Sequence, residues 1–135
     1  MSPEGSPEEP ATVLDASALL AMLHAEPGGD AVQELLPTAV ISTVNWSEVV
    51  QKALDRKVEV QGLRQDLEAL GLKILPLTVD QAERTAYLRA ETRHLGLSLG
   101  DRACLALAAE LGVPAVTADR AWKDLALDIE IRVAR

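Results

Sequence analysis

Four carboxylic acids stand at comparable places in the chain, each beside a short apolar segment. Asp15 follows Thr-Val-Leu, and Asp119 follows Ala-Val-Thr-Ala. Glu48 lies about one helical turn past Ala-Val-Ile, and Asp101 stands at the start of a strongly apolar helical segment. If the short segments are parallel strands, their carboxyl ends meet at one edge of a sheet, where open α/β sheets bind ligands. Acids gathered there repel one another and raise each other's pKa unless a cation joins them.

The chemistry that suits such a cluster is metal-dependent phosphodiester hydrolysis. Mg²⁺ and Mn²⁺ take carboxylate and water oxygens without needing His or Cys, and such an ion activates water and offsets charge at a phosphate. Each acid also has a plainer explanation. Asp15 and Asp101 suit helix starts and Asp119 suits a turn, because Asp accepts backbone N–H groups there. Glu48 could face the positive end of a helix dipole. Four acids converging at one edge favour the metal site.

Short apolar strands alternate with helical segments along the chain. Strands are predicted at residues 12–14, 39–41, 73–75, 115–117 and, with period-two alternation typical of an edge strand, 129–133. Helices are predicted at 16–23, 30–36, 43–53, 60–70, 79–94 and 102–111. In the helix at 79–94, Ala82, Ala86 and Leu88 are the expected inward positions. This alternation predicts an α/β fold, a three-layer α/β/α sandwich around a mostly parallel central sheet.

Composition limits the class of protein without deciding the function. The net charge is −8, with 21 acids against 13 Lys and Arg, which argues against non-specific nucleic-acid binding. A single cysteine, Cys104, excludes an internal disulfide and a cysteine zinc cage, fits a reducing cytoplasm and reads as a core residue. No apolar run approaches the ~18 residues of a membrane span. Residues 1–10, rich in Pro and Glu, are expected to be a disordered leader before a domain at 11–135.

The segments around the four acids resemble PIN-domain proteins and, more narrowly, VapC-type toxins of bacterial toxin–antitoxin pairs. The resemblance covers residues 12–133 and rests on four segments: Val-Leu-Asp15-Ala-Ser17, Ser42…Asn45-Trp-Ser-Glu48-Val, Leu-Ser98-Leu-Gly-Asp101-Arg-Ala-Cys, and Thr117-Ala-Asp119-Arg-Ala-Trp. It implies a PIN-like fold and a Mg²⁺- or Mn²⁺-dependent endoribonuclease that cleaves structured RNA, often tRNA or rRNA, and stops translation.

The resemblance also implies roles for individual residues. All four acids match the metal-binding acids of the family, with Asp15 and Asp101 as direct ligands. Glu48 and Asp119 would bind the ion directly or through water, or position the attacking water. Ser17 and Thr117 match small hydroxyl positions that support the acids, although an early-helix residue and a strand filler explain them equally well.

Basic and aromatic side chains near these segments are candidates for RNA contacts. Arg102, Arg120 and Lys123 could hold phosphates, and a solvated surface explains Arg102 and Arg120 equally well. Arg93 is expected to be simply solvated. The two tryptophans could stack on bases; of these, Trp46 is expected in the core and Trp122 is undecided.

The resemblance implies partners as well as a reaction. A cognate antitoxin with a basic and apolar tail would suit the acidic chain, with the helices at 16–23 and 30–36 as its groove. A C₂ homodimer is expected. Two alternatives stay open: a PIN-like module that binds metal or a partner without cutting RNA, and a receiver-type phosphotransfer domain. The second needs a Lys after a late strand, where this chain has Thr117-Ala-Asp119.

Overall fold

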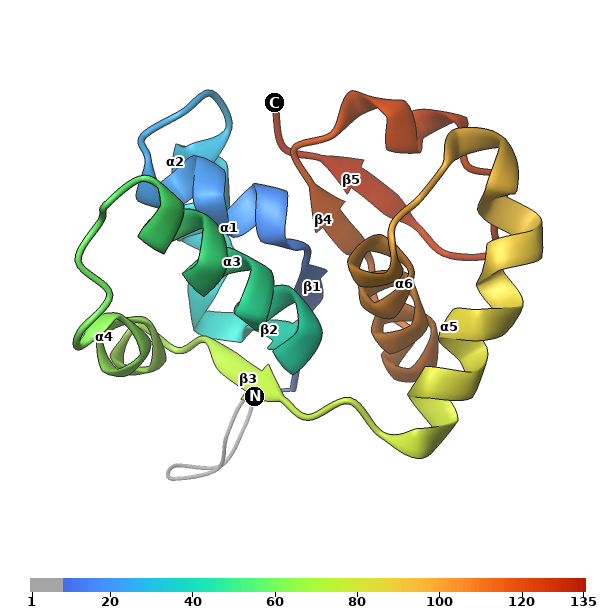
Figure 1. Cartoon of the computed structure of the whole chain (residues 1–135), viewed down its shortest axis with the longest axis horizontal. Helices are drawn as coiled ribbons and strands as arrows, with labels where there is room; N and C mark the ends of the chain where they lie inside the picture. Colours follow the sequence, from blue (N-terminus) through green and yellow to red (C-terminus); the bar gives the residue numbers. More distant parts are fainter. Residues whose placement is uncertain (1–8) are drawn as a thin grey trace.

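The computed structural model describes residues 9–135, so all but the last two residues of the expected leader lie outside it. Within that range the centre of the fold is one five-stranded sheet with the order β3-β2-β1-β4-β5 (Figure 1). Its pairings are all parallel, which confirms the predicted fold class. The predicted edge strand, β5, is at the edge. The strands are β1 (Thr12–Leu14), β2 (Ala39–Ser42), β3 (Lys73–Leu75), β4 (Ala115–Thr117) and β5 (Ile131–Val133).

Helices cover both faces of the sheet (Figure 1). Successive strand residues point to opposite faces. Leu14 and Ile41 therefore pack with the first helices of the chain, while Val13 and Val40 pack against α6 and Leu88 of α5. The helices are α1 (Ala16–Leu23), α2 (Gly29–Leu35), α3 (Thr43–Asp55), α4 (Leu63–Ala69), α5 (Val79–Thr92) and α6 (Leu99–Leu111), with 3₁₀ turns η1 (Leu36–Thr38), η2 (Arg93–Leu95) and η3 (Arg120–Asp124).

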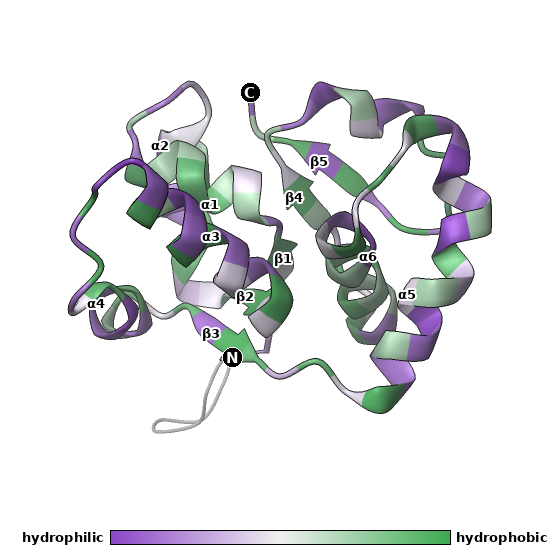
Figure 2. Cartoon of the chain, viewed as in Figure 1, coloured by the Kyte–Doolittle hydropathy of each residue, from purple (hydrophilic) through white to green (hydrophobic). Residues whose placement is uncertain are grey.

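Helix α6 is apolar on nearly every side because it lies between the sheet and α5 (Figure 2). It begins at Leu99, earlier than predicted, since Ser98 caps it. Helix α2 likewise starts after Gly28, at a φ of 90°, and Asp30 is a first-turn residue and not the expected cap. None of the helices in residues 9–135 is long and apolar enough to cross a membrane.

The buried face of α5 differs from the prediction. Leu88 points inward as expected, but Ala82 and Ala86 are exposed. The inward positions are Gln81, Thr85, Leu88 and Thr92. Two of them are threonines whose hydroxyls donate to carbonyls one turn earlier, from Thr85 to Gln81 O at 2.7 Å and from Thr92 to Leu88 O at 2.8 Å. Because the helix satisfies these hydroxyls itself, polar residues occupy a buried face that the alanines were expected to fill.

Candidate active site

Asp15 is buried at the carboxyl end of β1, where it caps α1. Its Oδ1 accepts from Ala18 N and from Ser17 Oγ, both at 2.8 Å, and its Oδ2 accepts from Thr117 Oγ1 at 2.6 Å. Ser17 and Thr117 thus both contact Asp15, in the supporting positions that the family pattern implied. Ser17 Oγ also accepts from Ala118 N at 2.9 Å, which ties α1 to the end of β4.

Burial raises the pKa of Asp15 to about 6, although the hydrogen bonds from Thr117, Ala18 and Ser17 lower it; the charge of Asp101 raises it further. The folded state therefore holds this proton at a pH where the unfolded chain, with its ordinary Asp pKa, has lost it. By linkage, stability is highest below the unfolded pKa and falls as the pH rises through about 6. Ionisation of Asp15 at neutral pH therefore lowers the stability of the folded state, and a nearby cation would offset this cost.

Glu48 extends from α3 over the first turn of α6. Buried Asn45 holds it, because Asn45 Nδ2 donates both to Glu48 Oε1 at 3.1 Å and to Gly100 O at 3.0 Å. A Cβ on Gly100 would lie 2.7 Å from Glu48 Cδ and closer still to Oε1, so any other residue at this position would displace the carboxylate from where it lies. Burial raises the pKa of Glu48; the Asn45 hydrogen bond lowers it, Asp101 raises it and Lys52 lowers it.

Asp101 lies in the first turn of α6, in a capping box with Ser98. Ser98 Oγ accepts from Asp101 N at 3.1 Å, and Asp101 Oδ2 accepts from Ser98 N at 3.0 Å. Its charge raises the pKa of both Asp15 and Glu48, so Asp101 lies within electrostatic range of each of them. All three carboxylates add to the effect of burial in raising the pKa of Cys104, which stays a protonated core thiol, as predicted.

Asp119 interacts with the end of β4 and with the turn that follows it. Its Oδ1 caps η3 by accepting from Ala121 N at 3.0 Å, and its own N–H donates to Thr117 Oγ1 at 3.0 Å. It is not among the groups that shift the pKa of Asp15 or Glu48. Of the four predicted acids, the structure therefore brings together Asp15, Glu48 and Asp101 and leaves Asp119 beside them.

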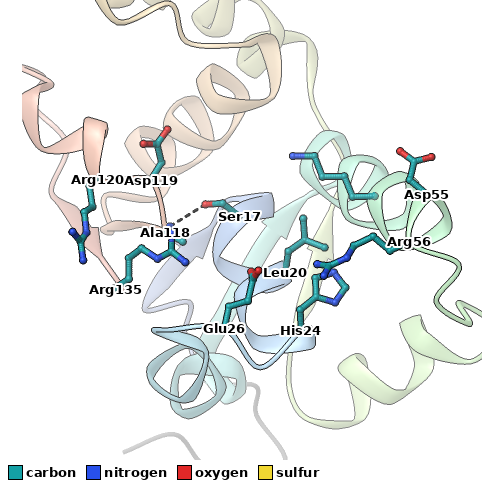
Figure 3. Close-up of a pocket in the computed structure, with 11 residues that line it drawn as sticks. Ser17, Leu20, His24, Glu26, Asp55, Arg56, Ala118, Asp119, Arg120 and Arg135 are labelled. Atoms are coloured by element: carbon teal, nitrogen blue, oxygen red, sulfur yellow. Dashed lines mark hydrogen bonds between the residues drawn. The ribbon is translucent and has the colours of Figure 1, made fainter.

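A cavity of about 590 Å³ lies between α1, the end of α3 and the β4–η3 connection (Figure 3), and of the four predicted acids only Asp119 lines it. Arg120 lines it, as expected of a phosphate contact, whereas Lys123 does not. Lys52 and Arg56 were missed by sequence reasoning, although they follow Glu48 on α3 at i+4 and i+8. The full lining is Ser17, Leu20, His24, Glu26, Lys52, Asp55, Arg56, Ala118, Asp119, Arg120 and Arg135.

Two candidates for RNA contacts, Arg102 and the undecided Trp122, are not found at this cavity. Arg102 is only 8% exposed and turns toward α5, where its Nη1 donates to Thr85 O at 2.8 Å. Trp122 is fully buried in the core, so it cannot stack on a base without unfolding. Trp46 is partly buried against the core, in agreement with its prediction.

The donor chemistry of the acid cluster fits a hard divalent ion. Within residues 9–135, no three His, Cys, Asp or Glu side chains are placed to hold a metal together. Mg²⁺, however, usually takes only one or two protein carboxylates and completes its shell with water. Asp15 and Asp101 repel each other across the site, and an ion between them would turn that repulsion into attraction.

Comparisons with known proteins agree with this geometry. The model of the PIN domain family matches residues 12–127. A chain of the toxin–antitoxin complex from Klebsiella pneumoniae is 25% identical over 93% of this chain and 98% of that chain, with a TM-score of 0.74. A chain of DNA-bound VapBC from Salmonella typhimurium shares the fold with a TM-score of 0.70 and 18% identity, over 93% of this chain and 99% of that chain. Mycobacterium tuberculosis VapC20 also shares it, with a TM-score of 0.70 and 16% identity, over 90% of this chain and 99% of that chain. No curated protein matches. Since the family match spans most of its length, the chain belongs to the PIN domain family.

Proposed function

We propose that the chain is a VapC-type toxin, a Mg²⁺- or Mn²⁺-dependent endoribonuclease that cleaves structured RNA such as tRNA or rRNA and thereby inhibits translation. The observation that carries this is the grouping of Asp15 and Glu48 around Asp101 at the carboxyl edge of the sheet, where burial and the charge of Asp101 raise the pKa of Asp15 and Glu48. Membership of the PIN family supports it. One similar structure is that of a toxin described as cleaving the sarcin–ricin loop.

Each residue has a distinct task in this proposal. A divalent ion, when bound by Asp15 and Asp101, would activate water and offset charge on the phosphate. Ser17 and Thr117 orient the Asp15 carboxylate through their hydrogen bonds. Asn45 fixes Glu48 over the start of α6, where its carboxylate can accept a proton from the attacking water. Asp119 would contact the bound ion indirectly, through a water molecule.

The adjoining cavity is the proposed path for the RNA beside the acids. Lys52, Arg56, Arg120 and Arg135 are its cationic lining residues, and guanidinium groups bind phosphate in bidentate fashion. These cationic residues outnumber the three acids of the same lining, Glu26, Asp55 and Asp119, so this cavity is less acidic than the chain as a whole, whose net charge is −8. Lys123 is exposed on η3 and is kept as an outer phosphate contact.

The proposed partners are a cognate antitoxin and a second copy of the chain, in the cytoplasm. Similar structures include VapBC complexes, which supports an antitoxin partner. The exposed large apolar residues do not lie on α1 or α2, where the antitoxin groove was expected, so the cavity beside α1 is the better candidate. A homodimer is supported by two large apolar side chains on α5, Val79 and Tyr87, which are each 77% exposed and could be covered by a second copy of the chain.

The test is cleavage of a total tRNA and rRNA pool by purified, antitoxin-free protein with Mg²⁺, with Mn²⁺ and with EDTA. Discrete cuts that require metal and are lost in Asp15→Asn and Asp101→Asn would support the nuclease. Circular dichroism establishes that each variant is folded. No cutting under any condition by folded protein would refute it.

The second candidate is a catalytically silent PIN-like module that binds metal or a partner. It is favoured by one observation, that no three of the described His, Cys, Asp or Glu side chains are placed to hold a metal ion. Under this alternative, folded protein would not cleave RNA with either ion, whether or not Mn²⁺ binds to it. The same assay, combined with calorimetric titration of Mn²⁺, separates the two functions.

A further inference from the structure

A second cavity, of about 240 Å³, lies between α5 and α6 and shares no lining residue with the first. Its walls come from the end of α5, η2, the loop before α6 and the first turn of α6. Three of the six lining residues are arginines and none is acidic, in a chain whose net charge is −8. Like charges around a hollow repel one another, and a bound anion removes that repulsion. The lining residues are Arg89, Thr92, Arg93, Gly96, Leu97 and Arg102.

Arg102 forms the buried wall of this arginine cavity. A guanidinium carries five N–H donors. Among residues 9–135, the Arg102 side chain makes one hydrogen bond, from Nη1 to Thr85 O at 2.8 Å. Its Nε is buried without a partner in that part of the chain, and the residue is 8% exposed. A buried charge with unused N–H donors lowers the stability of the fold unless an acceptor pairs with it. The Arg102 guanidinium therefore has free donors for an anion that enters the cavity.

Arg89 and Arg93 stand one turn apart at the end of α5 and are exposed. Within the described residues, the only side-chain ion pairs are Arg64–Glu68 and Arg132–Glu130, so neither arginine is neutralised by an acid. Their long side chains are free to turn toward an anion anchored by Arg102. Several guanidinium groups around one acceptor suit phosphate, whose oxygens accept paired N–H donors.

The position of the cavity indicates which phosphate it would hold. Asp101 and Arg102 are consecutive residues of α6, and consecutive side chains of a helix diverge by about 100°. Asp101 interacts electrostatically with Asp15 and Glu48, while Arg102 bonds to α5. The acid site and the arginine cavity therefore lie on different sides of the first turn of α6. A strand whose scissile phosphate lies at the acids would continue across this turn.

We propose that the cavity formed by Arg89, Arg93 and Arg102 holds a backbone phosphate of the RNA substrate, beyond the bond that is cleaved. This inference rests on the proposed nuclease function for its choice of ligand. Binding of a phosphate group by these arginines does not require that the protein cleaves RNA. Arg93, which the sequence assigned to solvent, and Arg102, which the sequence assigned to the acid site, become parts of one substrate-binding element.

The first measurement is binding of a fluorescent RNA hairpin in EDTA, where no cleavage occurs, over a range of NaCl concentrations. The variant is Arg89→Gln/Arg93→Gln, because both positions are exposed, whereas Arg102 joins α6 to α5. The matched control is Arg64→Gln/Arg84→Gln, which removes two charges from exposed helical positions outside both cavities. The cavity variant should bind at least about fivefold more weakly than the control, with a salt slope reduced by about 0.7–0.9 for one lost phosphate contact.

The second measurement is the melting temperature in sodium phosphate against NaCl at matched ionic strength. Phosphate should stabilise the wild type and the control more than the cavity variant. Equal RNA affinity and salt slope in the two variants would overturn the RNA assignment, and a phosphate effect that still needs the two arginines would then indicate a small phosphate-bearing ligand. If the wild type fails to cleave RNA, the nuclease proposal fails, while these two measurements still decide whether the cavity binds phosphate.

Discussion

Replacing Gly100 with Ala tests the geometry of Glu48 most directly. The new Cβ would lie 2.7 Å from Glu48 Cδ, whereas ordinary contacts begin at 3.4 Å. The carboxylate must therefore move by about 0.7 Å or more, since two carbon atoms prefer separations of about 3.5–4.0 Å. We expect this move to weaken the hydrogen bond from Asn45, because Asn45 Nδ2 is also bound to Gly100 O and is held in place by it. The methyl group displaces Glu48 without changing any charge in the site.

The expected effect is large on catalysis and small on stability. A misplacement of about 1 Å in an active site can lower the rate by about 100-fold. Alanine is favoured over glycine within a helix by about 0.5–1 kcal/mol, which offsets the roughly 1 kcal/mol of a lost Asn45–Glu48 hydrogen bond. We therefore expect kcat to fall about 100-fold, with a melting temperature close to that of the wild type.

The assay is single-turnover cleavage of a mapped RNA by the four members of a double-mutant cycle with Glu48→Ala. If Gly100→Ala acts through Glu48, it should have little further effect in the Glu48→Ala background, because the two residues are coupled. Wild-type activity in Gly100→Ala would refute the steric argument. An equal fold-loss in both backgrounds would refute the assignment to Glu48 and indicate a direct effect on the first turn of α6.

Three further predictions concern stability, metal and assembly. In metal-free buffer at pH 7.5, Asp15→Asn should raise the free energy of unfolding by up to roughly 3 kcal/mol, because burial raises the pKa of Asp15. Urea titrations should show this gain vanishing near pH 4, and a destabilised variant at pH 7.5 would contradict the desolvation argument. Millimolar Mn²⁺ should raise the melting temperature of the wild type but not of Asp15→Asn; equal shifts would place the ion elsewhere. Tyr87→Glu should convert a dimer into a monomer in light scattering, with Glu83→Gln as the exposed control on α5, and an unchanged mass would remove Tyr87 from the interface.

The sheet was predictable because each strand is short, apolar and followed by a helix start. Asp15 and Asp119 are placed by local sequence, since each caps the element that follows its strand. The buried face of α5 was not predictable from hydropathy. Thr85 and Thr92 satisfy their hydroxyls within the helix and so occupy buried positions that the pattern assigned to alanines.

The contacts that shape the site join distant parts of the chain and leave little local signal. Asn45 bridges α3 to Gly100, 55 residues later. Its spacing of three from Glu48 was visible, because residues three apart share a helix face, but its bond to Gly100 was not. Arg102 illustrates the opposite error. An arginine after an acid suggested a phosphate contact at the acids, and packing of α6 on α5 turned it away from them.

Several features of the acid site oppose stability, and they occur together. Asp15 is ionised at neutral pH only against the cost of burial, and Asp101 repels both Asp15 and Glu48. Gly100 weakens the start of α6, and Asn45 Oδ1 is buried without a partner within residues 9–135. Each cost could be removed by one substitution, and proteins commonly retain such costs where a ligand compensates for them. A divalent ion with its bound water would offset the repulsion, the desolvation of Asp15 and the unused amide oxygen at once, and this shared remedy supports the proposed metal-dependent chemistry at this edge of the sheet.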